Sequence, residues 1–162
     1  MAMKKFLLGM LLMAASTCAF AQFEKDTKYV GASLSGLNLS YSDERDFSLC
    51  LGGHAGYFIE DNIMLVGDLG IETQDLHLNK FKLGVKGRYY FEQNGVYCAA
   101  GLKYVHVRHA YDDVQLTPEV GYCYFLNQYL TVEPAVYCDM SLSDFGHRSE
   151  IGVKIGIGIY LK

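Results

Sequence analysis

The last thirteen residues, Glu150 to Lys162, alternate strictly between large apolar side chains and side chains that are small or polar. One parity is apolar throughout: Ile151, Val153, Ile155, Ile157, Ile159 and Leu161. Between residues 152 and 160 the other parity is mostly glycine, with Lys154 and Tyr160 as the exceptions. Because successive side chains of an extended chain leave opposite faces, this period of two predicts a β-strand.

The same alternation recurs along the chain and predicts eight strands. We expect them at 28–41, 47–58, 63–72, 81–91, 96–105, 114–124, 130–140 and 150–162. Tight turns are expected at 60–62, 92–95 and 127–128, and longer loops at 42–46, 74–80, 108–112 and 143–148. The first strand changes parity between Leu34 and Leu37, and we expect a β-bulge near Ser35-Gly36 to reconcile its two halves.

Charge separates the two faces of strands two to eight. The apolar parity carries no Asp, Glu, Lys or Arg. The other parity carries Asp68, Glu72, Lys82, Lys86, Arg88, Lys103, Glu119, Glu133, Asp139 and Lys154. A charge that faces lipid at mid-depth costs about 2–4 kcal/mol, so an uncharged face is what a bilayer requires.

A soluble β-sandwich or lipocalin-like barrel also alternates, with its apolar face inside. Three features favour a membrane barrel over that alternative. The polar face is rich in glycine, and the strands run to about eleven residues, near a tilted membrane span. Aromatic side chains also gather near both strand ends, as the girdles of membrane barrels do. They are Tyr57, Tyr89, Phe91, Tyr122, Tyr124 and Tyr129 beside the tight turns, and Tyr41, Phe47, Phe81 and Tyr104 towards the loops.

The chain resembles the small eight-stranded outer-membrane β-barrel family, the OmpA/OmpX-like "porin family". The resemblance lies in the alternation, in GYFIEDN at 56–62, in TPEVGYCYF at 117–125 and in the glycine-alternating last strand. It implies an all-β fold, an eight-stranded antiparallel up-and-down transmembrane β-barrel. The family's last strand usually ends on an aromatic residue that the barrel-insertion machinery reads, whereas Leu161 and Lys162 follow Tyr160 here.

The N-terminus predicts a cleavable signal peptide at 1–21 and a barrel domain at 22–162. Lys4 and Lys5 precede the apolar run 6–15, and Ala19-Phe20-Ala21 is an A-x-A cleavage signal. A short membrane anchor and lipidation at Cys18 are the alternatives. The predicted route is export across the inner membrane to the bacterial outer membrane.

The formal net charge of −4, or −6 without the leader, argues against a nucleic-acid partner. Four cysteines remain beyond Cys18: Cys50, Cys98, Cys123 and Cys138. The strand assignment separates them beyond disulfide reach, so we predict free thiols. His106 and His109 offer too few ligands for a metal site, and no cofactor is expected.

Eight strands leave an interior that side chains just fill. We expect a salt-bridged lumen network of Asp68, Lys86, Arg88, Lys103, Glu119, Glu133, Asp139 and Lys154. Asp68, Lys86, Lys103, Glu119, Glu133 and Lys154 should lie at middle depth. Buried charges persist only when paired, so a closed structural network is the expected state and an ion or proton path is the alternative.

His147 and Ser149 are the only pair that hints at an enzyme. Lipid A deacylases, also eight-stranded outer-membrane barrels, are similar in having a His-x-Ser pair. An activated serine needs a base and a group that orients the base, and only Asp144 and Glu150 are near in sequence. Glu150 also replaces the Asn usual after that serine. We therefore predict that the chain has no catalytic site. If it were an enzyme, His147 and Ser149 would be the candidate catalytic residues.

The sequence thus predicts a non-enzymatic, monomeric outer-membrane barrel with a structural, envelope-maintaining or surface-interaction role. Its expected partners are outer-membrane lipid and lipopolysaccharide, and the insertion machinery during assembly. A narrow porin-like channel and a lipid A-modifying enzyme are the alternative functions.

Overall fold

The computed structural model describes residues 23–40, 49–74, 77–91, 94–108 and 111–162. Its strands are β1 (Lys28–Ser40), β2 (Leu49–Glu60), β3 (Ile63–Gln74), β4 (His77–Tyr90), β5 (Val96–Val107), β6 (Tyr111–Leu116), β7 (Glu119–Tyr122), β8 (Tyr124–Phe125), β9 (Leu130–Ser141) and β10 (Glu150–Leu161). A single turn of helix, α2 (Phe145–Arg148), precedes β10. The predicted leader 1–21 lies outside the described residues.

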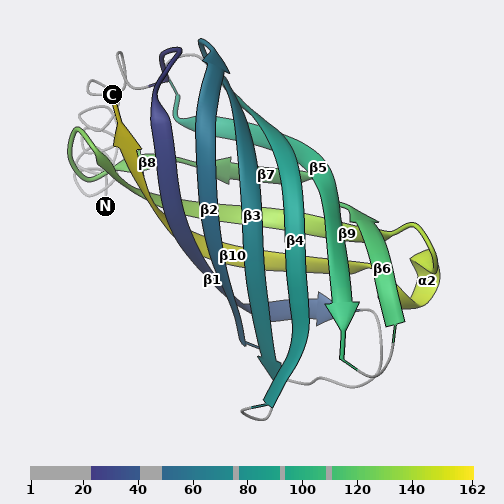
Figure 1. The fold of residues 1–162 in the computed structure, drawn as a ribbon. Helices are drawn as coiled ribbons and strands as arrows, with labels where there is room; N and C mark the ends of the chain where they lie inside the picture. Colours follow the sequence, from purple (N-terminus) through teal and green to yellow (C-terminus); the bar gives the residue numbers. More distant parts are fainter. Residues whose placement is uncertain (1–22, 41–48, 75–76, 92–93, 109–110) are drawn as a thin grey trace, which may run out of the picture.

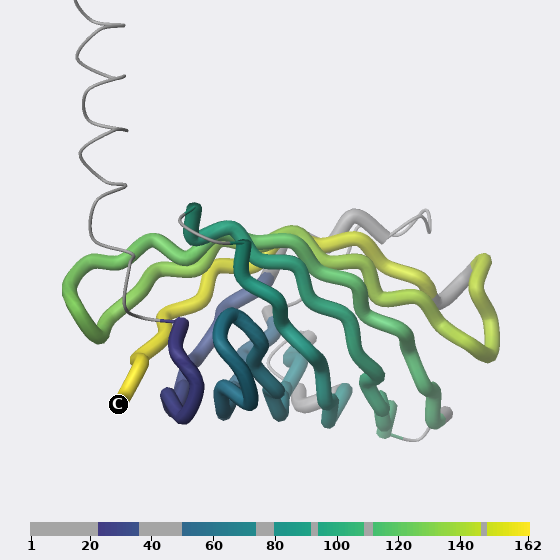
Figure 2. Tube along the Cα trace, turned by 90° about the horizontal axis from the view of Figure 1, so that it is seen from above, coloured from purple at the N-terminus to yellow at the C-terminus, as the bar shows by residue number. Residues whose placement is uncertain are grey.

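All pairings are antiparallel, and the sheet closes on itself because β10 pairs with both β9 and β1. In Figure 1, β2–β4 run across the front of the barrel while β9 and β10 cross behind them. Figure 2, from above, shows the same two walls, purple to teal on one side and green to yellow on the other. Closure removes the free edges that an open sheet would present.

The three short segments β6, β7 and β8 together form one wall strand between β5 and β9. Pro118, which has no N–H to donate, lies in the first break. Backbone bonds bridge both breaks: Thr117 N–H donates to Gly101 O at 2.9 Å, and Cys123 N–H to Gly95 O at 2.7 Å. The described strands therefore make a ring of eight, and the prediction of an eight-stranded antiparallel barrel is confirmed.

The turns predicted at 60–62 and 127–128 lie where the sequence places them, at the end of the barrel that also holds both ends of the described chain, whereas residues 92–93 of the turn predicted at 92–95 lie outside the described residues. We call this the turn end, and the opposite end the loop end. Asn62 and Gly95 adopt the left-handed conformation, with φ of 65° and 68°. Asn127 Oδ1 accepts the backbone N–H groups of Tyr129 and Leu130, both at 2.8 Å. Asparagine and glycine tolerate these conformations better than other residues do.

The predicted bulge in β1 is confirmed. The pairing of β1 with β10 shifts between Ser35 and Leu37, so Gly36 is the extra residue. On the turn side of the bulge, Val30 and Leu34 are about half exposed on the outer surface. Beyond it, Leu37 pairs with Val153, which also faces outward.

The predicted loop at 74–80 is wrong, because β3 runs to Gln74 and β4 already begins at His77. The register shifts beside Glu72 and Thr73, since Glu72 pairs with Lys80 but Thr73 pairs with Leu78. One extra residue on β4 breaks the alternation there, which is why the sequence reads as a loop. The predicted loop at 143–148 contains the helical turn α2, which the sequence did not predict.

The outer surface of the described strands is apolar across the middle of the barrel. Val85, Leu102, Val120 and Ile155 are each 55–59% exposed. Exposed aromatic rings lie near the turn end, at Tyr57, Tyr89, Phe91, Tyr122, Tyr124 and Tyr129, and Phe81 and Tyr104 lie nearer the loop end. Tyr41 and Phe47, the other predicted girdle residues, lie outside the described residues.

The interior holds an aromatic cluster near the turn end and charged side chains above it. The cluster comprises Phe23, Tyr29, Phe58, Met64, Val66, Tyr90, Tyr97, Cys123, Ala135 and Tyr160. Phe23, which precedes β1, stacks on Tyr90 with ring centroids 4.1 Å apart. Among the described residues, no helix combines the length and apolarity needed to cross a membrane.

Candidate functional site

The charged residues at mid-height converge on Glu119, at the start of β7. Its side chain is fully buried, and Lys86 Nζ and Lys154 Nζ donate to its Oε2 at 2.9 and 2.8 Å. Lys86 also pairs with Asp68 Oδ1 at 3.2 Å. Because these lysines come from β4 and β10, the carboxylate links opposite walls of the barrel.

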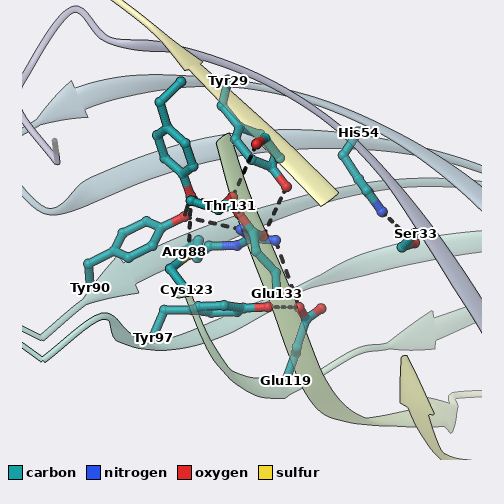
Figure 3. Close-up of polar contacts among 12 residues, drawn as sticks. Tyr29, Ser33, His54, Arg88, Tyr90, Tyr97, Glu119, Cys123, Thr131 and Glu133 are labelled. Atoms are coloured by element: carbon teal, nitrogen blue, oxygen red, sulfur yellow. Dashed lines mark hydrogen bonds and ion pairs between the residues drawn. The ribbon is translucent and has the colours of Figure 1, made fainter. Parts of the chain in front are cut away.

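A second carboxylate, Glu133 on β9, holds Arg88 just below this group. Arg88 NH1 donates to Glu133 Oε2 at 2.8 Å, and Arg88 NH2 lies 3.8 Å from Glu119 Oε1. The guanidinium also lies over the ring of Tyr97, 4.2 Å from its centroid. Figure 3 shows Arg88 between the two glutamates and the tyrosine rings. Ionic contacts of this kind satisfy charges that burial would otherwise destabilise.

Tyrosine hydroxyls complete the hydrogen bonding of both glutamates. Tyr29 and Tyr160 each donate to Glu133 at 3.0 Å, and Tyr97 donates to Glu119 Oε1 at 2.9 Å. The charge pattern of the sequence did not indicate these tyrosines, although their position on the inward parity was readable. Their rings join the aromatic cluster on one side and the charged group on the other, so the two layers form one continuous packing unit.

The remaining predicted charges form smaller sets nearer the loop end. Lys103 Nζ donates to Asp139 Oδ2 at 2.6 Å. Lys80 and Lys82 lie 2.8 and 2.7 Å from the two oxygens of Glu72. Of the eight residues predicted for the lumen, six make the connected group around Glu119 and Glu133, whereas Lys103 and Asp139 pair with each other.

A cavity of about 70 Å³ lies above the connected group. Lys86, Lys154 and Asp68 line it, together with Ser33 and His54. Ser33 Oγ lies 2.7 Å from His54 Nε2, and His54 Nδ1 hydrogen-bonds Asp68 Oδ1. Figure 3 shows the Ser33–His54 contact. At roughly 10–15 Å³ for each water, the cavity suits a few waters or a small molecule.

Sequence reasoning missed Ser33 and His54. His54 had a readable signal: it and Asp68 lie seven residues on either side of Asp61 in the turn, and they pair directly in the register of β2 and β3. Ser33 had no such signal, because its place follows from the phase of β1 and from the β1–β2 register, which no tight turn fixes.

The candidate enzyme pair stays a hypothesis. The side chain of His147 lies outside the described residues. Ser149 is half-buried, and its Oγ accepts the backbone N–H of Ser141 at 3.3 Å. Glu150, one of the two acids considered as a third group, accepts a hydrogen bond from Tyr137 at 3.3 Å.

No group of three or more His, Cys, Asp or Glu residues suited to a metal ion occurs in the described part of the chain. His106 Nδ1 lies 2.6 Å from Asp112 Oδ1 on the exposed surface. His109 lies outside the described residues. Cys50, Cys98, Cys123 and Cys138 are free thiols.

No family model matches the chain, and no curated protein matches it by sequence. Solved structures with a similar fold do exist. The N-terminal β-barrel domain of Pseudomonas aeruginosa OprF matches with a TM-score of 0.67 at 17% identity, over 85% of this chain and 98% of that chain. Neisserial surface protein A (NspA) matches with a TM-score of 0.58 at 12% identity, over 82% of this chain and 95% of that chain. A de novo designed transmembrane β-barrel matches with a TM-score of 0.57 at 18% identity, over 86% of this chain and 99% of that chain.

These matches, together with the closed ring of eight strands, define the fold: the chain has the fold of the small outer-membrane β-barrels. At these identities the similarity concerns the fold alone.

Proposed function

We propose that this chain is an integral protein of the bacterial outer membrane, with a closed lumen and a structural or surface-interaction role. The observation that carries the proposal is the inverted distribution of side chains. Branched apolar residues cover the outer wall, whereas Glu119, Glu133 and Arg88 are buried inside. Soluble monomers rarely expose an apolar patch beyond about 300–600 Å², and this surface surrounds the whole barrel.

The interior supports a closed lumen in preference to an open channel. Arg88, Glu119 and Glu133 cross the lumen at mid-height, held by contacts from several strands. Below them, Phe23 and Tyr90 stack at the turn end. An eight-stranded barrel has an interior just wide enough for its own side chains, so two such layers leave no continuous aqueous path.

The orientation follows from the two longest connections, 41–48 between β1 and β2 and 142–149 between β9 and β10, which both join strands at the loop end. In outer-membrane barrels the short turns are periplasmic and the longer loops are extracellular. The turn end, with both ends of the described chain, therefore faces the periplasm after export across the inner membrane. The outer wall contacts lipid and lipopolysaccharide, the loop end is available for surface contacts, and the insertion machinery is the partner during assembly.

Three measurements test this proposal. Folded barrels resist detergent and change gel mobility on boiling, so purified protein should migrate differently before and after heating. Protein reconstituted in planar bilayers should give no stable conductance, and Glu119→Gln should leave that result unchanged. A steady open channel whose conductance changes in Glu119→Gln would overturn the closed lumen and favour the narrow-channel function. Protein that stays monodisperse in buffer without detergent would overturn the membrane assignment itself.

A further inference from the structure

We propose that Ser33, His54 and Asp68 form a nucleophilic site inside the lumen that accepts acyl groups from small esters. The site is distinct from the His147–Ser149 pair at the loop end. It uses neighbouring strands β1, β2 and β3, whose ladders fix the three Cα positions. Its chemistry requires only that the barrel fold and its cavity admit a small ester, so it stands apart from the proposed envelope role.

The contacts follow the order that serine nucleophiles require. His54 with its proton on Nδ1 donates to the Asp68 carboxylate, which leaves Nε2 to accept the Ser33 hydroxyl at 2.7 Å. A serine is a weak nucleophile until an adjacent base can take its proton, and a third group must orient that base. Here Ser33 is the nucleophile, His54 is the base, and Asp68 is the positioning residue.

The space over the reacting atoms is kept open by a glycine. Gly52 pairs with Ser33 across the β1–β2 ladder. A Cβ at Gly52 would lie 2.8 Å from Ser33 Oγ and 3.4 Å from His54 Nε2, so any larger residue would occupy this space. Gly52, Ser33 and His54 all line the cavity. A carbonyl carbon can therefore approach the hydroxyl from the lumen side.

The positive charge needed at a developing oxyanion is present in the same cavity. Backbone N–H groups of the wall take part in the strand ladders, so lysine side chains must supply the donors. Lys154 and Lys86 both line the cavity and share Glu119 Oε2. An ammonium group has three donors, and Lys154 uses one of them on Glu119. Its remaining donors suit a negatively charged oxygen in a water-poor site.

The reaction is an acyl transfer. Ser33 Oγ adds to the ester carbonyl carbon as its proton moves to His54 Nε2, and the carbonyl electron pair moves onto oxygen. Collapse of this intermediate breaks the bond to the alkoxide, which takes the proton from Nε2 and leaves as the alcohol. Water then adds to acyl-Ser33 with the same proton transfers, releasing the carboxylic acid and restoring the serine.

The proposed substrate class is short-chain acyl esters, because charged and polar side chains, among them Asp68, Lys86 and Lys154, line the cavity beside Ser33 and suit a small polar ester. The test therefore uses p-nitrophenyl acetate with the full-length barrel refolded in detergent. After acid quenching, mass spectrometry of the peptides locates each acetyl group. We expect acetyl-Ser33 to accumulate. Ser35 lines the same cavity two residues away and serves as the internal control, expected to stay unmodified.

Variants separate chemistry from packing. His54→Gln should lower the rate of Ser33 acetylation about 10²-fold or more, the usual contribution of a general base. Asp68→Asn should also lower it, whereas Asp68→Glu, which keeps a carboxylate, should restore part of the rate. Heat-dependent gel mobility verifies that each variant is folded. Absence of acetyl-Ser33 in the native barrel, or equal rates in the native and folded His54→Gln proteins, would overturn the proposal.

Discussion

The ring of Tyr97 on β5 lies over Gly121 of β7, its direct partner across the ladder. A Cβ added at Gly121 would lie 2.4 Å from both Cζ and Oη of the tyrosine. Held in this position, Tyr97 donates its hydroxyl proton to Glu119 Oε1 at 2.9 Å. Tyr137 lies over Gly152 in the same way, with the same 2.4 Å separation. Glycine on the inner face thus makes room for the tyrosines that pack the lumen.

Gly121→Val should destabilise the barrel by about 1–3 kcal/mol, because the added side chain displaces Tyr97 from its bonding position. The measurement is urea unfolding from lipid vesicles, followed by tyrosine fluorescence. Gly87→Val is the matched control, since a Cβ at Gly87 meets nothing within 4 Å on the outer surface. Equal effects of the two substitutions would show that the glycine–tyrosine contact has no special role.

Glu119→Gln should cost about 3–5 kcal/mol of unfolding free energy. The substitution keeps the shape of the side chain but leaves Lys86 and Lys154 without their shared buried carboxylate. Glu60→Gln is the control, because its ion pair with Lys25 is more than half exposed and such pairs contribute about 0–1 kcal/mol. Should Glu119→Gln unfold like the control, the buried ion pairs would not be stabilising.

Val85→Lys should impair insertion into vesicles and destabilise the inserted protein by about 2–4 kcal/mol. Val85 lies near the middle of β4 and is 55% exposed on the outer wall, where the proposed environment is hydrocarbon. Ile63→Lys, at the end of β3 beside a tight turn, should cost only about 0–1 kcal/mol. Folding yields in vesicles report both values. Equal free-energy costs for Val85→Lys and Ile63→Lys would contradict the proposed position of the barrel in the membrane.

Phe23→Ala should destabilise the barrel by about 3–5 kcal/mol, because it leaves a cavity in the aromatic cluster at the turn end. Its ring is 6% exposed and stacks on Tyr90. Phe91→Ala provides the comparison, since Phe91 is 44% exposed and packs edge-on against Tyr89. The expected cost there is about 1 kcal/mol. Urea titration measures both, and a negligible cost for Phe23→Ala would mean that this residue does not close the turn end.

Most of the fold was predictable, because one local rule governs it. Alternation assigns each strand residue to the inner or outer face, and turn residues such as Asn62 and Gly95 set the hairpin registers. The rule failed in the pairing of β3 with β4, where one strand has an extra residue and no glycine indicates a bulge. The shift beside Glu72 and Thr73 therefore read as a loop, whereas the bulge at Gly36 was predicted.

The interior was less predictable, because its contacts depend on how the sheet closes. The sequence by itself determined which residues face inward, because successive side chains of a strand point to opposite faces of the sheet. Only the tertiary structure decided that Glu119 meets Lys86 and Lys154, and that Ser33 reaches His54. Strand tilt and the β1–β10 register set the relative heights of residues on distant strands, and no local pattern encodes those heights.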